Sequence, residues 1–190
     1  MAPSTVLPTS FARAVDQLKA VRPRSEIVIE DLPAPQRLAP YAYALGAAVL
    51  RQDDEVATGR LILLHDPAGH DAWSGTTRLV SYVTADLEAE LAVDPLLPSV
   101  AWSWLVEALD SREAAHTAIG GTVTQTTSSR FGALADTPVA ADVEIRASWT
   151  PLGGDLTSHA EAWYTLLASA AGLPPPGITA LGERFGPAPT

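Results

Sequence analysis

Three runs of β-prone residues follow one another along the chain with only short polar connections between them. The runs cover residues 41–50, 56–64 and 76–85, and the turn formers Gln52-Asp53-Asp54-Glu55 and Asp66-Pro67-Ala68-Gly69 lie between them. Strands joined so closely are not parallel neighbours, because a parallel pair needs a crossover of about a dozen residues or more. The pattern therefore predicts an antiparallel meander. In the first strand the predicted common face holds Tyr41, Tyr43, Leu45, Ala47 and Val49.

Three further strands are predicted from alternation and composition. Residues 26–32 alternate between apolar and polar side chains, although the sequence leaves open whether this strand joins the main sheet. Residues 141–149 alternate almost perfectly, which is typical of a half-buried antiparallel strand. Residues 120–129 are rich in threonine and poor in apolar side chains, which favours a peripheral strand.

Three helices are predicted from apolar stripes and breaking residues. The first begins at Thr9 or Ser10 and ends before Pro23. The second begins at residues 94–95 or at Ser99 and is apolar on all sides, so it must be covered on more than one side. The third begins with a capping box of Ser158 and Glu161 and ends near Gly172.

The predicted order is α-β-β-β-β-α-β-β-α, because the strands are grouped and do not alternate with helices. This order indicates an α+β fold, in which helices pack on an antiparallel sheet of five to six strands. We expect residues 1–9 to form a flexible arm and residues 10–173 to form a single domain. Residues 174–190 are rich in proline and glycine, so we expect a disordered tail.

Composition excludes several classes of protein. The 190 residues contain 12 Lys and Arg against 22 Asp and Glu, a net charge of −10, which argues against a nucleic-acid binder. The absence of cysteine excludes disulfides, thiol catalysis and cysteine-ligated metals. No secretory signal or membrane-spanning stretch is evident, so we expect a cytoplasmic protein with no membrane partner.

Two His-Asp dipeptides suggest one candidate binding site. His65, Asp66, His70 and Asp71 form the pattern H-D-x-x-x-H-D around a turn. Histidine can serve as a ligand or a base near neutral pH when a carboxylate orients it, so a small ligand or a metal could bind here. The alternative is an exposed hairpin loop with no function. The spacing matches no strong metal signature, and no metal ligand set, catalytic residue or cofactor is assigned.

Two arginines extend this candidate site. Arg37 lies in the stiff segment PAPQRLAP and could contact an anionic ligand, or it could pair with an acidic residue of a rigid connector. Arg78 could converge with it on a cleft. Ser74, the glycine pairs and the carboxylates around residues 86–94 match no catalytic or phosphate-binding motif.

Tryptophans in the second helix suggest an interface. Trp102 and Trp104 are two residues apart, about 200° around a helix, so we expect one to face the sheet and the other to lie outside. Both could still be structural. Together with Val106 they form the predicted interface, because tryptophan is enriched where proteins meet.

Two resemblances add to this interpretation. At PAPQRLAPYAYALGA, ATGRLILLHDPAGHDAW, DPLLPSVAWSWLVEAL and EIRASWTPLGGDL the chain resembles an actinobacterial family of unknown function, from about Phe11 to Pro176. The resemblance implies an actinobacterial, cytoplasmic protein and no transferable activity. The order of elements alone looks like that of type III secretion chaperones, small acidic proteins that dimerise through the middle helix and bind extended polypeptides.

We favour a non-enzymatic binding or chaperone-like protein that acts through a hydrophobic helix or sheet surface. A homodimer and a polypeptide partner are its expected assemblies. The alternative is a small-ligand- or metal-binding protein, or an enzyme, that uses the loop from His65 to Asp71.

Overall fold

The computed structural model describes residues 7–88, 90–135 and 140–176. The chain order of its helices and strands agrees with the predicted order. The helices are α1 (Thr9–Ala20), α2 (Leu97–Ser111) and α3 (Thr157–Ala170), and the strands are β1 (Ile27–Leu32), β2 (Tyr41–Arg51), β3 (Asp54–His70), β4 (Gly75–Asp86), β5 (His116–Ser128) and β6 (Ala140–Pro151). Short 3₁₀ turns lie at η1 (Asp71–Trp73), η2 (Leu91–Val93) and η3 (Gly132–Leu134).

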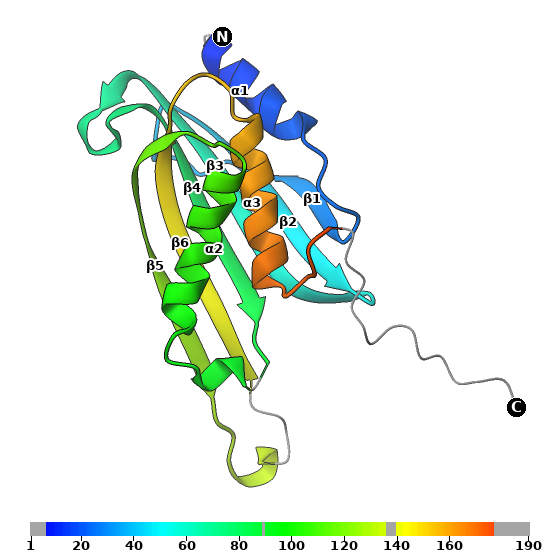
Figure 1. Ribbon diagram of the computed structural model, residues 1–190. Coiled ribbons are helices and arrows are strands. Elements are labelled where there is room, and N and C mark those ends of the chain that lie inside the picture. The colour runs from blue at the N-terminus through cyan, green and yellow to red at the C-terminus, as the bar shows by residue number, and fades with distance from the viewer. Residues whose placement is uncertain (1–6, 89, 136–139, 177–190) are drawn as a thin grey trace, which may run out of the picture.

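One six-stranded sheet runs through the described part of the chain, in the order β1-β2-β3-β4-β6-β5 (Figure 1). Every neighbouring pair is antiparallel. The predicted meander forms β2, β3 and β4, and the strand near residues 26–32 joins the sheet as the edge β1. The threonine-rich strand is the opposite edge, β5, so its predicted peripheral place is confirmed.

The three helices cover one face of the sheet, and no helix of the described residues lies on the other face (Figure 1). The fold is therefore α+β, as the grouped strands indicate. The core lies between the helices and the sheet. It includes Leu61, Val83, Ile145 and Trp163, all fully buried.

The common face predicted for the first strand of the meander lies on the helix side of β2, where Leu45, Ala47 and Val49 are buried. Burial does not alternate along β2, because Ala44 and Gly46 on the other face are buried as well. The predicted alternation is confirmed in β6, where Val143, Ile145, Ala147 and Trp149 are buried on the helix side and the residues that alternate with them are half-buried or exposed.

The turn predicted at Asp66-Pro67-Ala68-Gly69 does not reverse the chain. Asp66 Oδ1 accepts a hydrogen bond from the backbone N–H of Ala68 at 3.0 Å, and Gly69 has a φ of 79°, so the local turn chemistry is present. The strand nevertheless continues, and His70 pairs with Gly75 beyond an irregularity in register. The chain reverses at η1 and Ser74, which adopts a left-handed conformation.

The starts of two helices differ from prediction. The helix α2 begins at Leu97, between the two predicted starts, and Asp94 Oδ1 accepts a hydrogen bond from Leu96 N at 2.8 Å just outside it. The capping box predicted for α3 is wrong, because no side chain caps this helix and Ser158 lies within it. Instead, Asp155 Oδ1 accepts a hydrogen bond from Thr157 N at 2.9 Å.

Two other predictions concern the ends of the chain. Gly172 follows α3 with a φ of 64°, as predicted for a residue that terminates a helix. Most of the predicted arm and tail, residues 1–6 and 177–190, lies outside the described residues. Within the described ranges, no helix is long and apolar enough to cross a bilayer.

Candidate functional site

His65 packs into the molecule on the helix side of β3. It is 7% exposed, and its ring lies against Phe11 of α1 and Tyr41 of β2, with centroid distances of 6.1 and 6.2 Å. Its Nδ1 is 3.2 Å from Thr77 Oγ1 and its Nε2 is 3.5 Å from Ser10 Oγ. This histidine therefore joins α1 to the end of the sheet.

The other members of the His-Asp pattern lie in the β3–β4 hairpin. His70 is exposed, stacks on Trp73 at 4.9 Å and accepts a hydrogen bond from Ala72 N at its Nδ1. Asp66 accepts a hydrogen bond from Ala68 N within its own turn, and Asp71 is exposed in η1. These groups stabilise the hairpin. Within the described ranges, no three His, Asp or Glu side chains are placed to hold a metal ion.

The two predicted arginines do not converge on this hairpin. Arg37 is exposed in the segment between β1 and β2, where it has a φ of 69°. Arg78 faces the helix-free side of the sheet and donates hydrogen bonds to Thr150 Oγ1 at 3.1 Å and Ser148 Oγ at 2.8 Å. Burial lowers the pKa of its guanidinium. Because His65 faces the helices, Arg78 and His65 lie on opposite faces of the sheet.

The two tryptophans of α2 do not divide between core and surface as expected. Trp102 and Trp104 are both half-buried and both pack against the margin of the main core. Trp102 lies over β5, where a Cβ at Gly121 would come within 2.9 Å of its ring. Val106 is half-buried on the same helix.

The helix-free face of the sheet divides into a polar half and an apolar half. On β5 and β6 the residues of this face are polar, among them Thr122, Thr124 and Glu144. On β1 to β4 most are apolar. Ala44 and Leu64 are buried, whereas solvent reaches Val28, Leu32, Ala48, Ile62 and Val80. A solvated face of an antiparallel sheet is ordinarily polar. The apolar half is therefore a candidate contact surface.

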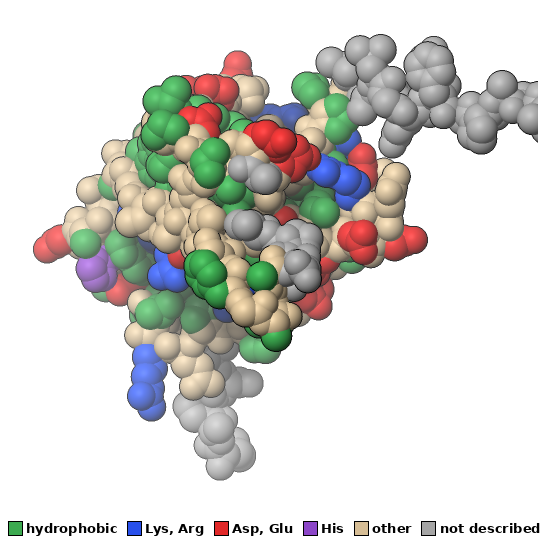
Figure 2. Space-filling model, turned by 90° about the horizontal axis from the view of Figure 1, so that it is seen from below, with side chains coloured by type: hydrophobic (Ala, Val, Ile, Leu, Met, Phe, Trp, Pro, Cys, Tyr) green, Lys and Arg blue, Asp and Glu red, His purple; other side chains and the backbone are tan. Residues whose placement is uncertain are grey.

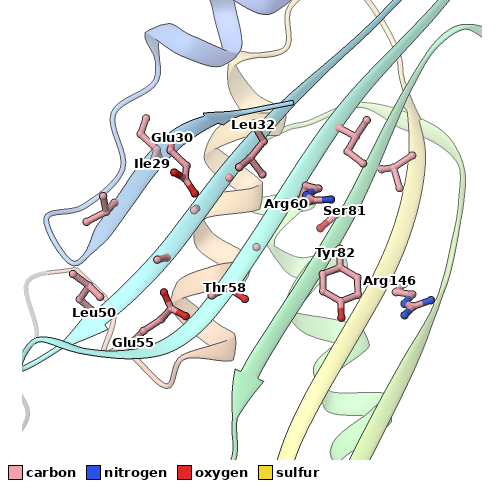
Figure 3. Close-up of a pocket in the computed structure, with 17 residues that line it drawn as sticks. Ile29, Glu30, Leu32, Leu50, Glu55, Thr58, Arg60, Ser81, Tyr82 and Arg146 are labelled. Carbon is pink, nitrogen blue, oxygen red and sulfur yellow. The ribbon is translucent and has the colours of Figure 1, made fainter. Parts of the chain in front are cut away.

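A groove of about 860 Å³ runs over this apolar half (Figure 3). The groove is deep over the central strands because their side chains on this face are small. At Gly46 a Cβ would lie 2.9 Å from the side chain of Leu32, so glycine allows Leu32 to lie across β2. Ala48 and Thr58 continue the floor towards the β2–β3 hairpin. The groove is thus shaped by residues of low volume and walled by larger apolar ones.

Charged side chains cross the groove along one row of the sheet register. From β1 to β5 this row consists of Glu30, Gly46, Arg60, Tyr82, Arg146 and Thr122. Arg60 is exposed, and it forms no hydrogen bond or ion pair with any residue that the structure describes. Its guanidinium is therefore available to a ligand.

Tyr82 and Arg146 close one end of the groove as an ordered cluster (Figure 3). The Tyr82 hydroxyl donates a hydrogen bond to Glu144 Oε2 at 2.6 Å, and Arg146 Nε lies 2.6 Å from Glu144 Oε1. Arg146 also lies over the Tyr82 ring at 5.3 Å. The hydrogen bond from Tyr82, which has the largest effect, and the one from Arg146 lower the pKa of the Glu144 carboxyl. The cluster therefore stays ionised at neutral pH and holds this wall in place.

The groove was not predicted from the sequence, although a signal for it was present. Residues 41–50 and 61–64 are apolar almost without interruption, which is typical of strands that are covered on both faces. The prediction for residues 41–50 assigned a common apolar face on one side only. No sequence signal identified Arg60, because it is one of several exposed arginines.

A second exposed apolar area lies at the end of the molecule where α2 begins (Figure 2). Val93, Leu96 and Val100 are 77, 64 and 44% exposed there. The area borders β5, because Gln125 Nε2 donates a hydrogen bond to Ala92 O. Val100 precedes Trp104 by four residues, so the area is continuous with the side of α2 that carries Trp104.

A family model described as a protein of unknown function, DUF3000, matches residues 7–179. The chain belongs to this family. The match includes every residue of the groove and every candidate site residue named above. No curated protein and no solved structure matches the chain. The architectural likeness to type III secretion chaperones therefore remains a prediction.

Proposed function

We propose that this member of the DUF3000 family is a non-enzymatic binding protein that holds an amphipathic helix of a partner polypeptide in the sheet groove. The observation that carries the proposal is the apolar half of a sheet face that no helix of the described ranges covers. Apolar sheet faces are ordinarily buried against another layer of secondary structure. A polypeptide helix is the element that commonly supplies such a layer.

The dimensions of the groove support a helix. Strands in a sheet lie about 4.8 Å apart, so β1 to β4 present a face about 14 Å wide. A helix with its side chains is about 10 Å across and fits this width. Val28, Ile62 and Val80 would contact its apolar stripe.

The charges of the groove support a partner helix with both acidic and basic flanks. Arg60 offers an unpaired guanidinium for an acidic side chain. Glu30 and Glu55, at the β1 and hairpin sides of the groove, would favour a basic one. Because these groups are solvated, they would determine orientation more than affinity.

The first experiment is native mass spectrometry on the protein purified from its own host, followed by photo-crosslinking. A photoreactive side chain at Val28 should crosslink one partner, and the crosslinked segment should be amphipathic. As a synthetic peptide, this segment should bind and become helical. Val80→Glu should weaken its binding at least about tenfold, because the new carboxylate must be desolvated in the groove.

Thr122→Glu is the matched control, because Thr122 lies on the polar half of the same face and is exposed. It should leave binding unchanged. Equal crosslinking from positions 28 and 122, or equal binding by both glutamate variants, would contradict the proposed site. A bound metal or small molecule in place of a polypeptide would favour the alternative role of the loop from His65 to Asp71.

We also propose that two copies associate through α2 and β5. Residues 115–129 contain no charged side chain, although the chain has a net charge of −10. A strand edge of this kind lacks the charges that ordinarily prevent pairing. The other edge, β1, carries Glu30 and Asp31. A cytoplasmic location and an actinobacterial source also remain predictions.

A further inference from the structure

A small pocket on the helix side of the molecule gathers three arginines. It has a volume of about 270 Å³ and lies between the loop that follows α1, the residue that follows α2 and the outer side of α3. Arg22 and Arg24 come from the loop, Arg112 follows α2, and Glu161, Tyr164 and Thr165 belong to α3. The groove described above lies on the opposite face of the sheet.

The pocket is positively charged in an acidic protein. Its lining holds three arginines and one carboxylate, Glu161. With Glu26, which pairs with Arg24, the local formal charge is +1, whereas the whole chain has a net charge of −10. A local positive excess is unexpected from this composition. It concentrates anions at this position.

Two of the three guanidinium groups retain hydrogen-bonding capacity. Arg24 is engaged, because it binds both carboxylate oxygens of Glu26 at 3.1 and 2.6 Å. Arg22 forms no ion pair with any described residue, and it donates one hydrogen bond, to Lys19 O at 2.9 Å. Arg112 reaches Glu161 at 3.4 Å and Thr165 at 3.5 Å, both long contacts. Arg22 and Arg112 therefore have N–H donors left for a ligand.

A buried hydroxyl in the lining is also without a partner. Tyr164 is 5% exposed, and its hydroxyl oxygen has no hydrogen-bond partner among the described residues. Burial raises the pKa of Tyr164 to about 12, against a smaller opposite effect of the Arg22 charge. The group is therefore a neutral donor at physiological pH. Native proteins rarely leave such a group unsatisfied.

We propose that this arginine pocket binds the phosphate group of a small ligand, with Arg22 and Arg112 as the charged contacts and Tyr164 as a hydroxyl donor. A phosphate has three terminal oxygens, which match the several N–H and O–H donors left in the lining. A carboxylate has two oxygens and would leave donors unused. The site is independent of the proposed helix groove.

The test is a titration of the full chain with inorganic phosphate against sodium chloride at equal ionic strength. The readout is the ¹H–¹⁵N signals of the arginine side chains. Phosphate should shift the Arg22 and Arg112 signals saturably. Arg22→Gln and Arg112→Gln should each weaken the apparent affinity about tenfold, because each removes one charged contact. Tyr164→Phe should weaken the apparent affinity for phosphate less than the arginine variants do, and the Arg22 signal should still shift when phosphate is added.

Arg13→Gln is the matched control, since Arg13 is an exposed arginine of α1 that lines neither the pocket nor the groove. It should leave phosphate binding unchanged. Arg22 and Arg112 are exposed as well, so their variants are expected to fold. The proposal would be overturned if sodium chloride or acetate shifted the arginine signals as much as phosphate does. It would also be overturned if the phosphate-dependent shifts persisted in both arginine variants.

Discussion

At the scale of single residues, His159 links the stability of the fold to pH. It is 1% exposed in α3, and Trp149 Nε1 donates a hydrogen bond to its Nδ1 at 3.1 Å. Burial, followed by the charge of His116, lowers its pKa from 6.5 to about 4, and Asp155 opposes the shift. The folded protein therefore favours the neutral form of the His159 ring.

This shift makes the folded state less stable in acid. Above pH 6.5 the histidine is neutral in both states and contributes nothing to the pH dependence. Between pH 6.5 and about 4 the unfolded chain takes up a proton that the folded chain does not, so the free energy of unfolding falls as pH falls. The loss from this group amounts to about 3 kcal/mol when complete.

His159→Asn should remove this dependence. The asparagine carbonyl can accept the Trp149 hydrogen bond, whereas the side chain does not titrate. Urea unfolding between about pH 4 and pH 7 should therefore show a flatter profile for the variant, by up to about 3 kcal/mol. His70→Asn, at an exposed histidine, should keep the wild-type profile. Parallel profiles for His159→Asn and wild type would contradict the assignment.

At the scale of elements, the contact between α3 and the sheet depends on a glycine. A Cβ at Gly59 of β3 would lie 2.7 Å from Leu167 Cδ2 and 2.9 Å from Trp163 Cζ2. Both side chains are fully buried. The helix therefore approaches β3 more closely than any larger residue would permit.

Gly59→Ala should lower the free energy of unfolding by about 1–3 kcal/mol, because the packed neighbours must move. Gly120→Ala is the control in β5, since no atom lies within 4 Å of its Cβ position. It should change stability little or raise it, because alanine is less flexible than glycine in the unfolded chain. Urea denaturation of both variants measures the difference. A fully stable Gly59→Ala protein would show that α3 can shift on the sheet.

At the scale of the whole molecule, the proposed association of two copies makes a prediction about size. Wild-type protein should behave as a dimer in size-exclusion chromatography with light scattering. Val106→Glu should shift it towards the monomer, because like charges would face each other across a two-fold interface. Its circular dichroism should remain that of wild type. Gln36→Glu adds the same charge in the exposed segment between β1 and β2 and should remain dimeric. A monomeric wild type at high concentration would contradict the interface.

The candidate sites were less predictable than the fold, and particular residues show why. His65 and Arg78 were predicted to converge on one cleft. In the sheet His65 pairs with Thr77, so Arg78, the next residue of β4, points to the opposite face. The groove escaped notice because Gly46 and Arg60 are neighbours only through the register of β2 and β3. Arg22 and Arg112 lie 90 positions apart in the chain, and no local pattern connects them.

The strands, their antiparallel order in the meander and the chain order of helices and strands could be predicted from the amino-acid sequence. These features follow from periodicity and from connections too short for any other arrangement. Which sheet face the helices cover, and which side chains meet there, depends on tertiary packing. Periodicity indicates that a face is apolar, but what covers it depends on packing between elements far apart in the chain. The open groove and the arginine pocket both arise at this level.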